Sequence, residues 1–528
     1  MPVLRRLGPL GALAGIVVLG AGIPLLFVAA SSLELGWSQW IGLWNSRLPG
    51  LLWNTLSLAV LVAIGSFALG VSAAWWTTRY DFRGRRLALW LMLLPLTVPT
   101  YVFAHIYTVL LQEEGWLGRV WHAVLGADAP LPDLYNVYGA TFILSLAGFS
   151  YVFLLVRSAL AFSHRNLEEA ARMQGASRWT TFWRINLPLL RPAIAAGLAL
   201  VVLHVLSDFG AVSMLRYQTF TLAIYLQMSG RFDYSAAAGL SLVLVFLSLT
   251  FLVVERFFRS RQRYFTGAQT RPIELKRAGA AQQLLIWSWL GLISLFAFGL
   301  PLAWMLTWSW EAWLQGLIDR EFWGYVGNSL TVAVLAASGA LIAAFPVAYY
   351  HARGHRVLGK VYLQMSSVGF VLPGPVIALG ILAFVLATMP ILYGSLLALV
   401  LALVIRFLPL AVQSQDASIQ QLTPSLEQVG RVLGAGPLEN LWRITLPVIR
   451  SGMAAAWVLV FIDALKELPA TLLLRPTGFD TLPVRIWIEA SEEMLELAAP
   501  AALMLVIGTL PVLWIMLRNA ARAADTPE

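Results

Sequence analysis

A short polar stretch occurs twice in the sequence, at 168–188 and at 427–447, each time between long apolar runs. Every matched position is separated by 259 residues. Arginine and aromatic side chains on an exposed segment favour binding to another protein. The repeat therefore predicts two equivalent partner-binding segments. The matched pairs are Glu168 and Glu427, Arg172 and Arg431, Gly175 and Gly434, Trp183 and Trp442, and Pro188 and Pro447.

The first copy is typical of a helix, a turn and a second helix. Gly175 permits the turn, and Ser177 can cap the second helix, which would carry Phe182 and Trp183 on its surface. A single copy of this pattern would fit an amphipathic helix that lies on lipid headgroups. Two copies at identical spacing instead favour two identical sockets on a partner.

Three acidic residues near the ends of apolar runs could contact a transported solute. Asp208 and Glu467 occupy matching positions, and Asp463 lies one helical turn before Glu467. Carboxylate oxygens suit a hard cation, and acids at membrane depth usually face a cavity or a partner. Basic residues nearby, Arg216 and Arg475, favour an outer gate held by ion pairs over direct ligation. We therefore predict no firm metal site.

The segment from Gly354 to Val361 nearly fits a nucleotide-binding P-loop. It lacks the Ser or Thr that contacts magnesium, and no strand precedes it. We expect no nucleotide or other cofactor on this chain. The sequence also has no cysteine, which excludes disulfides and thiolate catalysis.

The composition is that of a membrane protein, because 59% of the 528 residues are hydrophobic and 12% are charged. Apolar runs of about 20 residues, which suffice to cross a bilayer, recur throughout. We predict an all-α polytopic protein with twelve transmembrane helices. They lie near 8–30, 55–76, 87–111, 138–162, 192–207, 236–255, 284–308, 329–350, 361–388, 391–412, 451–466 and 497–517.

The basic residues gather on alternate loops, which predicts a cytoplasmic N-terminus and a cytoplasmic C-terminus. The net charge of +9 then reflects this bias and not affinity for nucleic acid. Both polar stretches face the cytoplasm in this arrangement. An even number of spans in each half gives two parallel, pseudo-symmetric halves. We place the first at 1–258, a linker at 259–283 and the second at 284–528.

Further matches extend the repeat beyond the two loops. Residues 208–216 match 467–475 with the same shift of 259. Looser matches pair Asn54 with Asn328 and 83–86 with 353–356. Most of the chain is therefore duplicated.

The pattern Glu169-Ala170-Ala171, Gly175 and Ile185-x-Leu-Pro188 resembles the EAA loop of membrane subunits of bacterial binding-protein-dependent ABC importers. The resemblance places one such loop at 166–188 and a second, degenerate one at 425–447, where Gln428-Val429-Gly430 replaces Glu-Ala-Ala. It implies ATPase-coupling roles for Glu168, Glu169, Ala170, Ala171, Gly175, Ile185, Pro188, Glu427, Gly434, Ile444 and Pro447.

The same resemblance implies a type I ABC importer permease fold in the bacterial cytoplasmic membrane. It implies as partners two copies of an ABC ATPase, which carry ATP and magnesium, a periplasmic or lipid-anchored solute-binding protein, and membrane lipid. ATP hydrolysis then takes place on separate subunits, and this chain is not an enzyme.

Within that family, 207–213, 218–221, 466–476 and 478–482 look most like fused ferric-iron permeases. Permeases for thiamine, polyamines, sulfate and phosphonates are built similarly and remain alternatives. An ion-coupled secondary transporter is disfavoured because charges are few in mid-span. A membrane-embedded enzyme ranks last, because the six histidines are scattered and show no metal-binding spacing.

Overall fold

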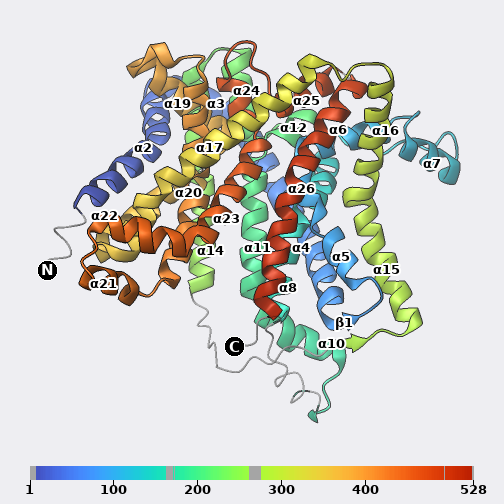
Figure 1. Ribbon diagram of the computed structural model, residues 1–528. Helices are drawn as coiled ribbons and strands as arrows, with labels where there is room; N and C mark the ends of the chain where they lie inside the picture. The colour runs from blue at the N-terminus through green and yellow to red at the C-terminus, as the bar shows by residue number, and fades with distance from the viewer. Residues whose placement is uncertain are drawn as a thin grey trace. The chain divides into compact units, whose positions relative to one another are not determined.

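The computed structural model describes residues 8–161, 171, 173–260, 275–370, 372–492 and 494–525 (Figure 1). Among these residues, nine helices are long and apolar enough to cross a membrane, and two bent helix pairs raise the number to as many as 11. The nine are α2 (Gly8–Ser32), α4 (Leu48–Arg79), α8 (Val137–Ala161), α11 (Leu187–Ser207), α14 (Tyr234–Ser260), α15 (Ala280–Ser294) with α16 (Leu300–Leu314), α17 (Arg320–Arg353), α20 (Leu396–Gln421) and α23 (Leu446–Leu465). A further long helix, α26 (Leu495–Asp525), ends the described chain.

Shorter elements connect these helices. They are α3 (Trp37–Ser46), α7 (Trp116–Leu125), α10 (Arg178–Thr181), α12 (Gly210–Met214), α13 (Phe220–Tyr225), α21 (Pro424–Val432), α22 (Pro437–Asn440), α24 (Pro469–Leu474), α25 (Leu482–Ser491) and η6 (Pro390–Leu392). Wider, π-helical turns form η2 (Phe182–Asn186), η3 (Leu226–Gly230), η4 (Leu295–Gly299) and η7 (Leu441–Thr445).

Two spans that the sequence suggests as continuous helices are broken. The span at 87–111 consists of α5 (Arg85–Leu91), η1 (Leu94–Thr97) and α6 (Thr100–Leu110), with a bend of 97°. The span at 361–388 consists of α18 (Arg356–Ser366), η5 (Ser367–Phe370) and α19 (Gly374–Thr388), with a bend of 102°. Pro99 and Pro373 precede the second helix of each pair, and proline interrupts the helical hydrogen bonds. The last predicted span, 497–517, lies within α26.

The chain folds into two compact units that do not coincide with its sequence halves. One unit contains Ile41–Leu222 and Phe246–Glu311, and its centre is the trio of α4, α8 and α11. Helix α15, which opens the second sequence half, packs in this unit against α4 and α5. Trp289 of α15 donates a hydrogen bond to the Ser72 hydroxyl of α4 at 3.0 Å.

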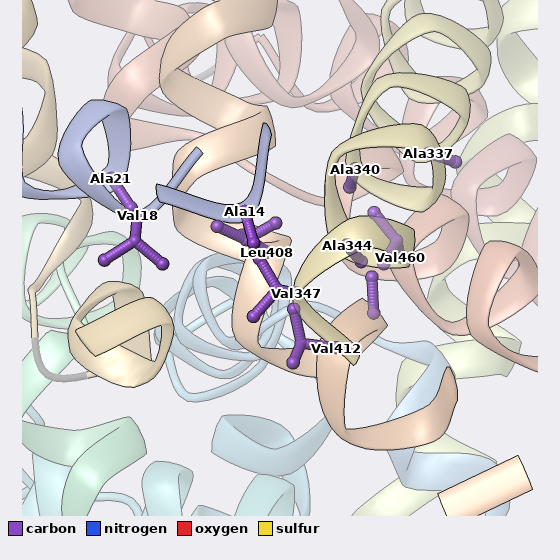
Figure 2. Close-up of a cluster of buried hydrophobic side chains, with 11 residues drawn as sticks. Ala14, Val18, Ala21, Ala337, Ala340, Ala344, Val347, Leu408, Val412 and Val460 are labelled. Atoms are coloured by element: carbon purple, nitrogen blue, oxygen red, sulfur yellow. The ribbon is translucent and has the colours of Figure 1, made fainter. Parts of the chain in front are cut away.

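The other unit contains Met1–Trp40, Ala223–Val245 and Ala312–Glu528, with α17, α20 and α23 at its centre. Helix α2, from the start of the chain, packs here against α17 and α19. Figure 2 shows small side chains of the buried cluster at this contact, including Ala14 and Val18 of α2 and Ala344 and Val347 of α17. The first long helix of each sequence half therefore belongs to the unit built mainly by the other half.

One pair of short strands is the exception to the all-helical prediction within the described residues. Strand β1 (Tyr80–Asp81) follows α4 and pairs in parallel with β2 (Lys276–Arg277), just before α15. Phe82 also packs edge-on against Trp287, with ring centroids 6.0 Å apart. The end of the predicted linker is therefore anchored to the loop after α4, and helix α15 begins at Ala280, within the predicted linker range.

Candidate coupling loops and gate

The second loop, 425–447, is a helical hairpin. Helix α21 starts with Pro424 and ends before Gly434, whose φ of +93° favours glycine. Two hydrogen bonds close the turn, from Gly434 N–H to Arg431 O at 3.1 Å and from Ala435 N–H to Gly430 O at 3.0 Å. This is the Schellman arrangement that ends many helices. The chain then passes through α22 and η7 into α23 without a break.

Glu427 lies at the centre of this hairpin with a side chain that is 1% exposed. Its carboxylate accepts hydrogen bonds from Arg353 Nε at 3.1 Å and Thr445 Oγ1 at 3.1 Å. Its backbone carbonyl accepts one from Asn440 Nδ2 at 2.8 Å. Arg353 also donates to the Leu422 carbonyl at 2.6 Å. Glu427 therefore ties the hairpin to the last residue of α17 and is not accessible to another protein.

One of the departures of the second loop from Glu-Ala-Ala, Gly430, has a packing reason. Gly430 stands where the first loop has Ala171. A Cβ atom at Gly430 would lie 2.3 Å from Ile444 Cδ1 and 2.8 Å from Asn440 Oδ1. Glycine thus allows α21 to approach η7 closely.

The tip of the second loop exposes large apolar side chains. Val432 is 86% exposed and Leu433 81%, beside the turn, and Trp442 on η7 is 65% exposed. The salt bridge between Arg443 and Glu439, at 2.9 Å, is also exposed. Apolar side chains exposed in such a group are typical of an interaction surface.

In the first loop, 166–188, Glu168, Glu169 and Ala170 lie outside the described residues. The turn that follows repeats the second loop, because Gly175 has φ +83° and Ala176 N–H bonds to Ala171 O at 3.0 Å. As predicted, Ser177 caps the next helix, accepting a hydrogen bond from Thr180 N–H at 3.1 Å.

The π-helical turn η2 leads from this loop into α11, as η7 leads into α23. The half-buried Ile185 and Ile444 lie in the two turns, and Pro188 and Pro447 lie in the first turn of the helices that follow. Asn186, the counterpart of Thr445, is buried and accepts a hydrogen bond from Arg79 at 3.4 Å. Arg79 ends α4 as Arg353 ends α17, so Arg79 is the structural counterpart of Arg353. The sequence match with Arg83 is wrong because β1 adds residues between α4 and α5.

Asp208 and Glu467 cap helices that begin after two equivalent breaks. The Asp208 carboxylate accepts hydrogen bonds from the N–H groups of Ala211 at 3.0 Å and Val212 at 3.2 Å. Glu467 accepts the same pair of bonds from Ala470 at 3.0 Å and Thr471 at 3.1 Å. Thr100 donates a further bond to Asp208 at 2.5 Å. Both carboxylates therefore stabilise the first turn of a helix, α12 for Asp208 and α24 for Glu467.

Glu467 does not form an ion pair with Arg475, the arginine that the sequence suggested. Arg475 pairs with Asp480 at 2.8 Å, and Glu467 pairs instead with Arg406 of α20 at 3.4 Å. Gly374 makes room for this arginine, because a Cβ atom there would lie 2.1 Å from its Nη1. We did not predict this pair from the sequence. Arg406 is a basic residue inside a predicted apolar span, 391–412, and its position there was the indication of a buried partner. The matching position in α8 is Ala147.

Asp463 is exposed on α23 and takes no part in the hydrogen bonds that cap α24. Across the part of the chain that the structure describes, no three His, Cys, Asp or Glu side chains lie close enough to hold a metal ion. The three predicted acids therefore do not form one ligand cluster within either unit.

A second contact is repeated at the opposite ends of α4 and α17. Asn54 Nδ2 donates to the Gln218 carbonyl at 3.0 Å, and Asn328 Nδ2 donates to the Asp480 carbonyl at 2.9 Å. The predicted match between the two asparagines is confirmed by this shared contact. Each asparagine fixes the loop that follows α12 or α24 to the start of a long helix.

Beside Asn328, the second copy also carries an ionic network. Arg485 lies 2.8 Å from Glu489 and 3.7 Å from Asp480. Burial raises the pKa of the Glu489 carboxyl, and the Arg485 charge offsets part of this rise. The cation thus favours the ionised form of a carboxylate that burial alone would disfavour.

Two copies of a helical hairpin and of a capped helix break, set among long apolar helices, define a membrane protein built from an internal repeat. The family described as "Binding-protein-dependent transport system inner membrane component" matches residues 66–264 and 336–524. The chain belongs to this family, once in each half. It is a multi-pass inner-membrane permease subunit of an ABC importer and not the ATPase.

The curated relatives include ferric-iron permeases. The chain is 32% identical over 492 residues to an Fe(3+)-transport system permease protein of Haemophilus influenzae, covering 92% of this chain and 93% of the relative. It is 27% identical to a ferric transport system permease protein of Actinobacillus pleuropneumoniae, covering 80% of this chain and 64% of the relative. A crystal structure of a bacterial alginate ABC transporter matches 45% of this chain with 19% identity and a TM-score of 0.38, too distant to support an argument.

Proposed function

We propose that this permease carries ferric iron into the cytoplasm. The observation that supports the substrate is the 32% identity to an Fe(3+) permease, which extends over 92% of the chain. A sulfate permease of Escherichia coli matches only 45% of the chain, at 30% identity. Similarity to the iron permease thus includes both halves and the breaks at Asp208 and Glu467.

Two ATPase subunits dock on the first and second loops and supply the energy. The exposed apolar tip of the second loop, around Leu433, supports this contact, and the turn at Gly175 offers the first loop the same backbone shape. The buried bond between Glu427 and Arg353 makes the hairpin rigid with α17. A displacement of the hairpin is then passed to α17 and α23 without being absorbed in the loop.

The coupling role of Glu427 is that of a positioning residue, because its carboxylate is enclosed. The residues at the turn, Gly175 and Gly434, set the direction in which each hairpin projects. In this proposal, twelve spans cross the membrane, both termini are cytoplasmic, and both loops lie at the cytoplasmic face. ATP and magnesium are held by the ATPase pair.

A solute-binding protein delivers iron at the opposite face. Asp208 and Glu467 there act in an outer gate, where they hold the two helix breaks in shape, and iron is not held by a resident ligand set. Both carboxylates already accept hydrogen bonds from backbone N–H groups, which supports a structural role over binding of iron. Iron then passes through when the two halves rock and open the path outward, then inward.

The test is transport by the complete complex in proteoliposomes with its binding protein and ATPase. We expect ATP-dependent uptake of radiolabelled ferric iron that is absent without the binding protein. Thiamine, putrescine and sulfate supplied with the same binding protein should not be taken up. Uptake of one of these in place of iron would contradict the substrate, and uptake driven by an ion gradient without ATP would contradict the mechanism.

A further inference from the structure

Helix α17 contains a proline close to the end that meets the second loop. Pro346 has no N–H group for the helical hydrogen bond, and its ring crowds the preceding turn, so the helix is weakened there. The segment beyond it, 347–353, ends with Arg353, which binds the buried Glu427 of the second loop. A displacement of that loop would therefore bend α17 at Pro346 unless another element held the two sides of the proline together.

Two adjacent residues of α20 bind α17 on the two sides of Pro346. Gln415 donates from Nε2 to the carbonyl of Leu341, which precedes the proline, at 2.9 Å. Asp416 accepts a hydrogen bond from Nδ1 of His351, which follows the proline, at 2.7 Å. Because the two bonds start from neighbouring residues of one helix, they join the two segments of α17 through α20.

The surroundings of these side chains strengthen both bonds. Gln415 is fully buried, and only 11% of the Asp416 side chain and 17% of the His351 side chain are exposed. Gln420, one turn further along α20, donates to the second Asp416 oxygen at 2.7 Å and so fixes the carboxylate. Alanines of α17 and α20 pack in one buried cluster (Figure 2). Hydrogen bonds that are shielded from water in this way are stronger than exposed ones.

The first sequence half has neither the proline nor the residues that bridge it. In the alignment that pairs the ends of α4 and α17, Ser72 stands where α17 has Pro346. Thr77, at the position of His351, donates its hydroxyl hydrogen bonds to carbonyls of its own helix. At 156–157, α8 has valine and arginine in place of the amide and the carboxylate of α20. The bridging residues thus occur in the half that has the proline.

We propose that Gln415, Asp416 and His351 are positioning residues for coupling. Together they form a bridge, the α20 bridge, that limits bending of α17 at Pro346. Through this bridge, a displacement of the second loop passes along the whole of α17 and is not lost in a bend at the proline. The inference rests on the proposed docking of an ATPase on the second loop. The first half needs no such bridge, because α4 has no proline in its interior.

Hydrogen–deuterium exchange of the purified full-length chain tests the α20 bridge directly. His351→Phe removes the donor and keeps an aromatic ring. We expect exchange of the amides at 347–353 to rise about tenfold, as the loss of one hydrogen bond to a charged group allows. His351→Asn, whose amide N–H replaces the Nδ1–H donor, should keep exchange near the native rate. Pro346→Ala combined with His351→Phe should also restore the native rate, because the helix is then continuous.

Ser338→Ala is the matched control, because it also removes one hydrogen bond between α17 and another helix. Trp457 of α23 donates from Nε1 to the Ser338 hydroxyl at 3.1 Å, and this bond does not involve α20. Exchange at 347–353 should stay native in this control. A rise as large as that in His351→Phe would overturn the proposal. The absence of any rise in His351→Phe, or a rise that Pro346→Ala does not suppress, would overturn it as well.

The role in coupling is measured in the complete complex as the ratio of iron imported to ATP hydrolysed. We expect this ratio to fall about fivefold in His351→Phe, at the lower end of the coupling factors between linked sites. It should recover when Pro346→Ala is added, and an unchanged ratio in His351→Phe would overturn the role in coupling. Exchange needs neither ATPase nor iron. If the native complex shows no ATP-dependent uptake, the proposed function and the coupling role both fail, while exchange still decides whether the α20 bridge exists.

Discussion

The first and second loops share one backbone path, although Asn186 of the first loop stands where the second has Thr445. Both turn at a glycine with positive φ, and both continue through a π-helical turn into a long helix. In the second loop, the buried Glu427 joins Arg353 to Thr445. In the described part of the first loop, Arg79 reaches Asn186 directly. The comparison teaches that the backbone sets the hairpin shape, because different side chains, Asn186 and Thr445, occupy matching positions beside the last residue of the preceding long helix.

The helix breaks at Asp208 and Glu467 also share a backbone arrangement and differ in side chains. Asp208 and Glu467 accept equivalent backbone hydrogen bonds, although their side chains differ in length. Thr100 completes the first break, and the Arg406 cation is close to the second. The backbone hydrogen bonds and a threonine hydroxyl donor are common to both, since Thr471 also donates to Glu467. The arginine is not shared, because Ala147 stands at the position that matches Arg406.

The largest expected effect comes from Glu427→Ala. The substitution leaves Arg353 buried beside the hairpin without its carboxylate partner, and breaking a buried pair in this way costs about 3–5 kcal/mol. We expect a matching loss in the free energy of unfolding and loss of ATP-dependent uptake. Equilibrium unfolding in mixed micelles measures the first quantity.

Glu439→Ala is the control for that substitution, because its salt bridge with Arg443 is exposed. Exposed pairs contribute about 0–1 kcal/mol, so unfolding should change little. A loss in Glu427→Ala no greater than in this control would contradict the central role of the buried carboxylate.

The packing of the two hairpins is compared by Gly430→Ala and Ala171→Gly. The Cβ atom introduced at Gly430 meets Ile444 and Asn440, and overpacking of this kind costs about 1–3 kcal/mol. The reverse change in the first loop should cost only about 0.5–1 kcal/mol, as expected for glycine in place of alanine in a helix. Thermal unfolding of the two variants side by side measures the asymmetry, and equal shifts would argue against it.

The turns themselves are tested by Gly175→Val and Gly434→Val. A branched side chain at positive φ costs about 1–2 kcal/mol, while no described residue lies within 4 Å of the added Cβ atom at either glycine. We expect folded protein in which ATP hydrolysis continues and uptake falls, most strongly in the double variant. The ratio of iron imported to ATP hydrolysed measures this uncoupling, and a normal ratio in the double variant would refute the coupling assignment.

The smallest effect is expected at the other end of the long helices. Asn54→Ala and Asn328→Ala each remove one hydrogen bond to a loop carbonyl, which contributes about 0.5–1.5 kcal/mol. The two losses should be similar, because the contacts are equivalent. Differential scanning fluorimetry in detergent can compare the two melting temperatures. A large effect at only one asparagine would show that the two contacts are not energetically equivalent.

Much of the organisation could be predicted from the sequence. The fixed shift of 259 residues located both hairpins, their glycine turns and both capped breaks, since each depends on a few neighbouring residues. The apolar runs predicted the membrane helices, although prolines Pro99 and Pro373 bend two of them sharply. The resemblance to permeases of binding-protein-dependent importers is confirmed by the family match.

Only the tertiary structure decided which distant side chains meet. No local pattern pairs Glu427 with Arg353, 74 residues away, or Glu467 with Arg406 in place of Arg475. Nor does any pattern place α2 and α15 in units built mainly by the opposite sequence halves. The physical reason is that helix formation, turns and caps depend on neighbouring residues, whereas the partner of a buried charge depends on which helices the packing brings together.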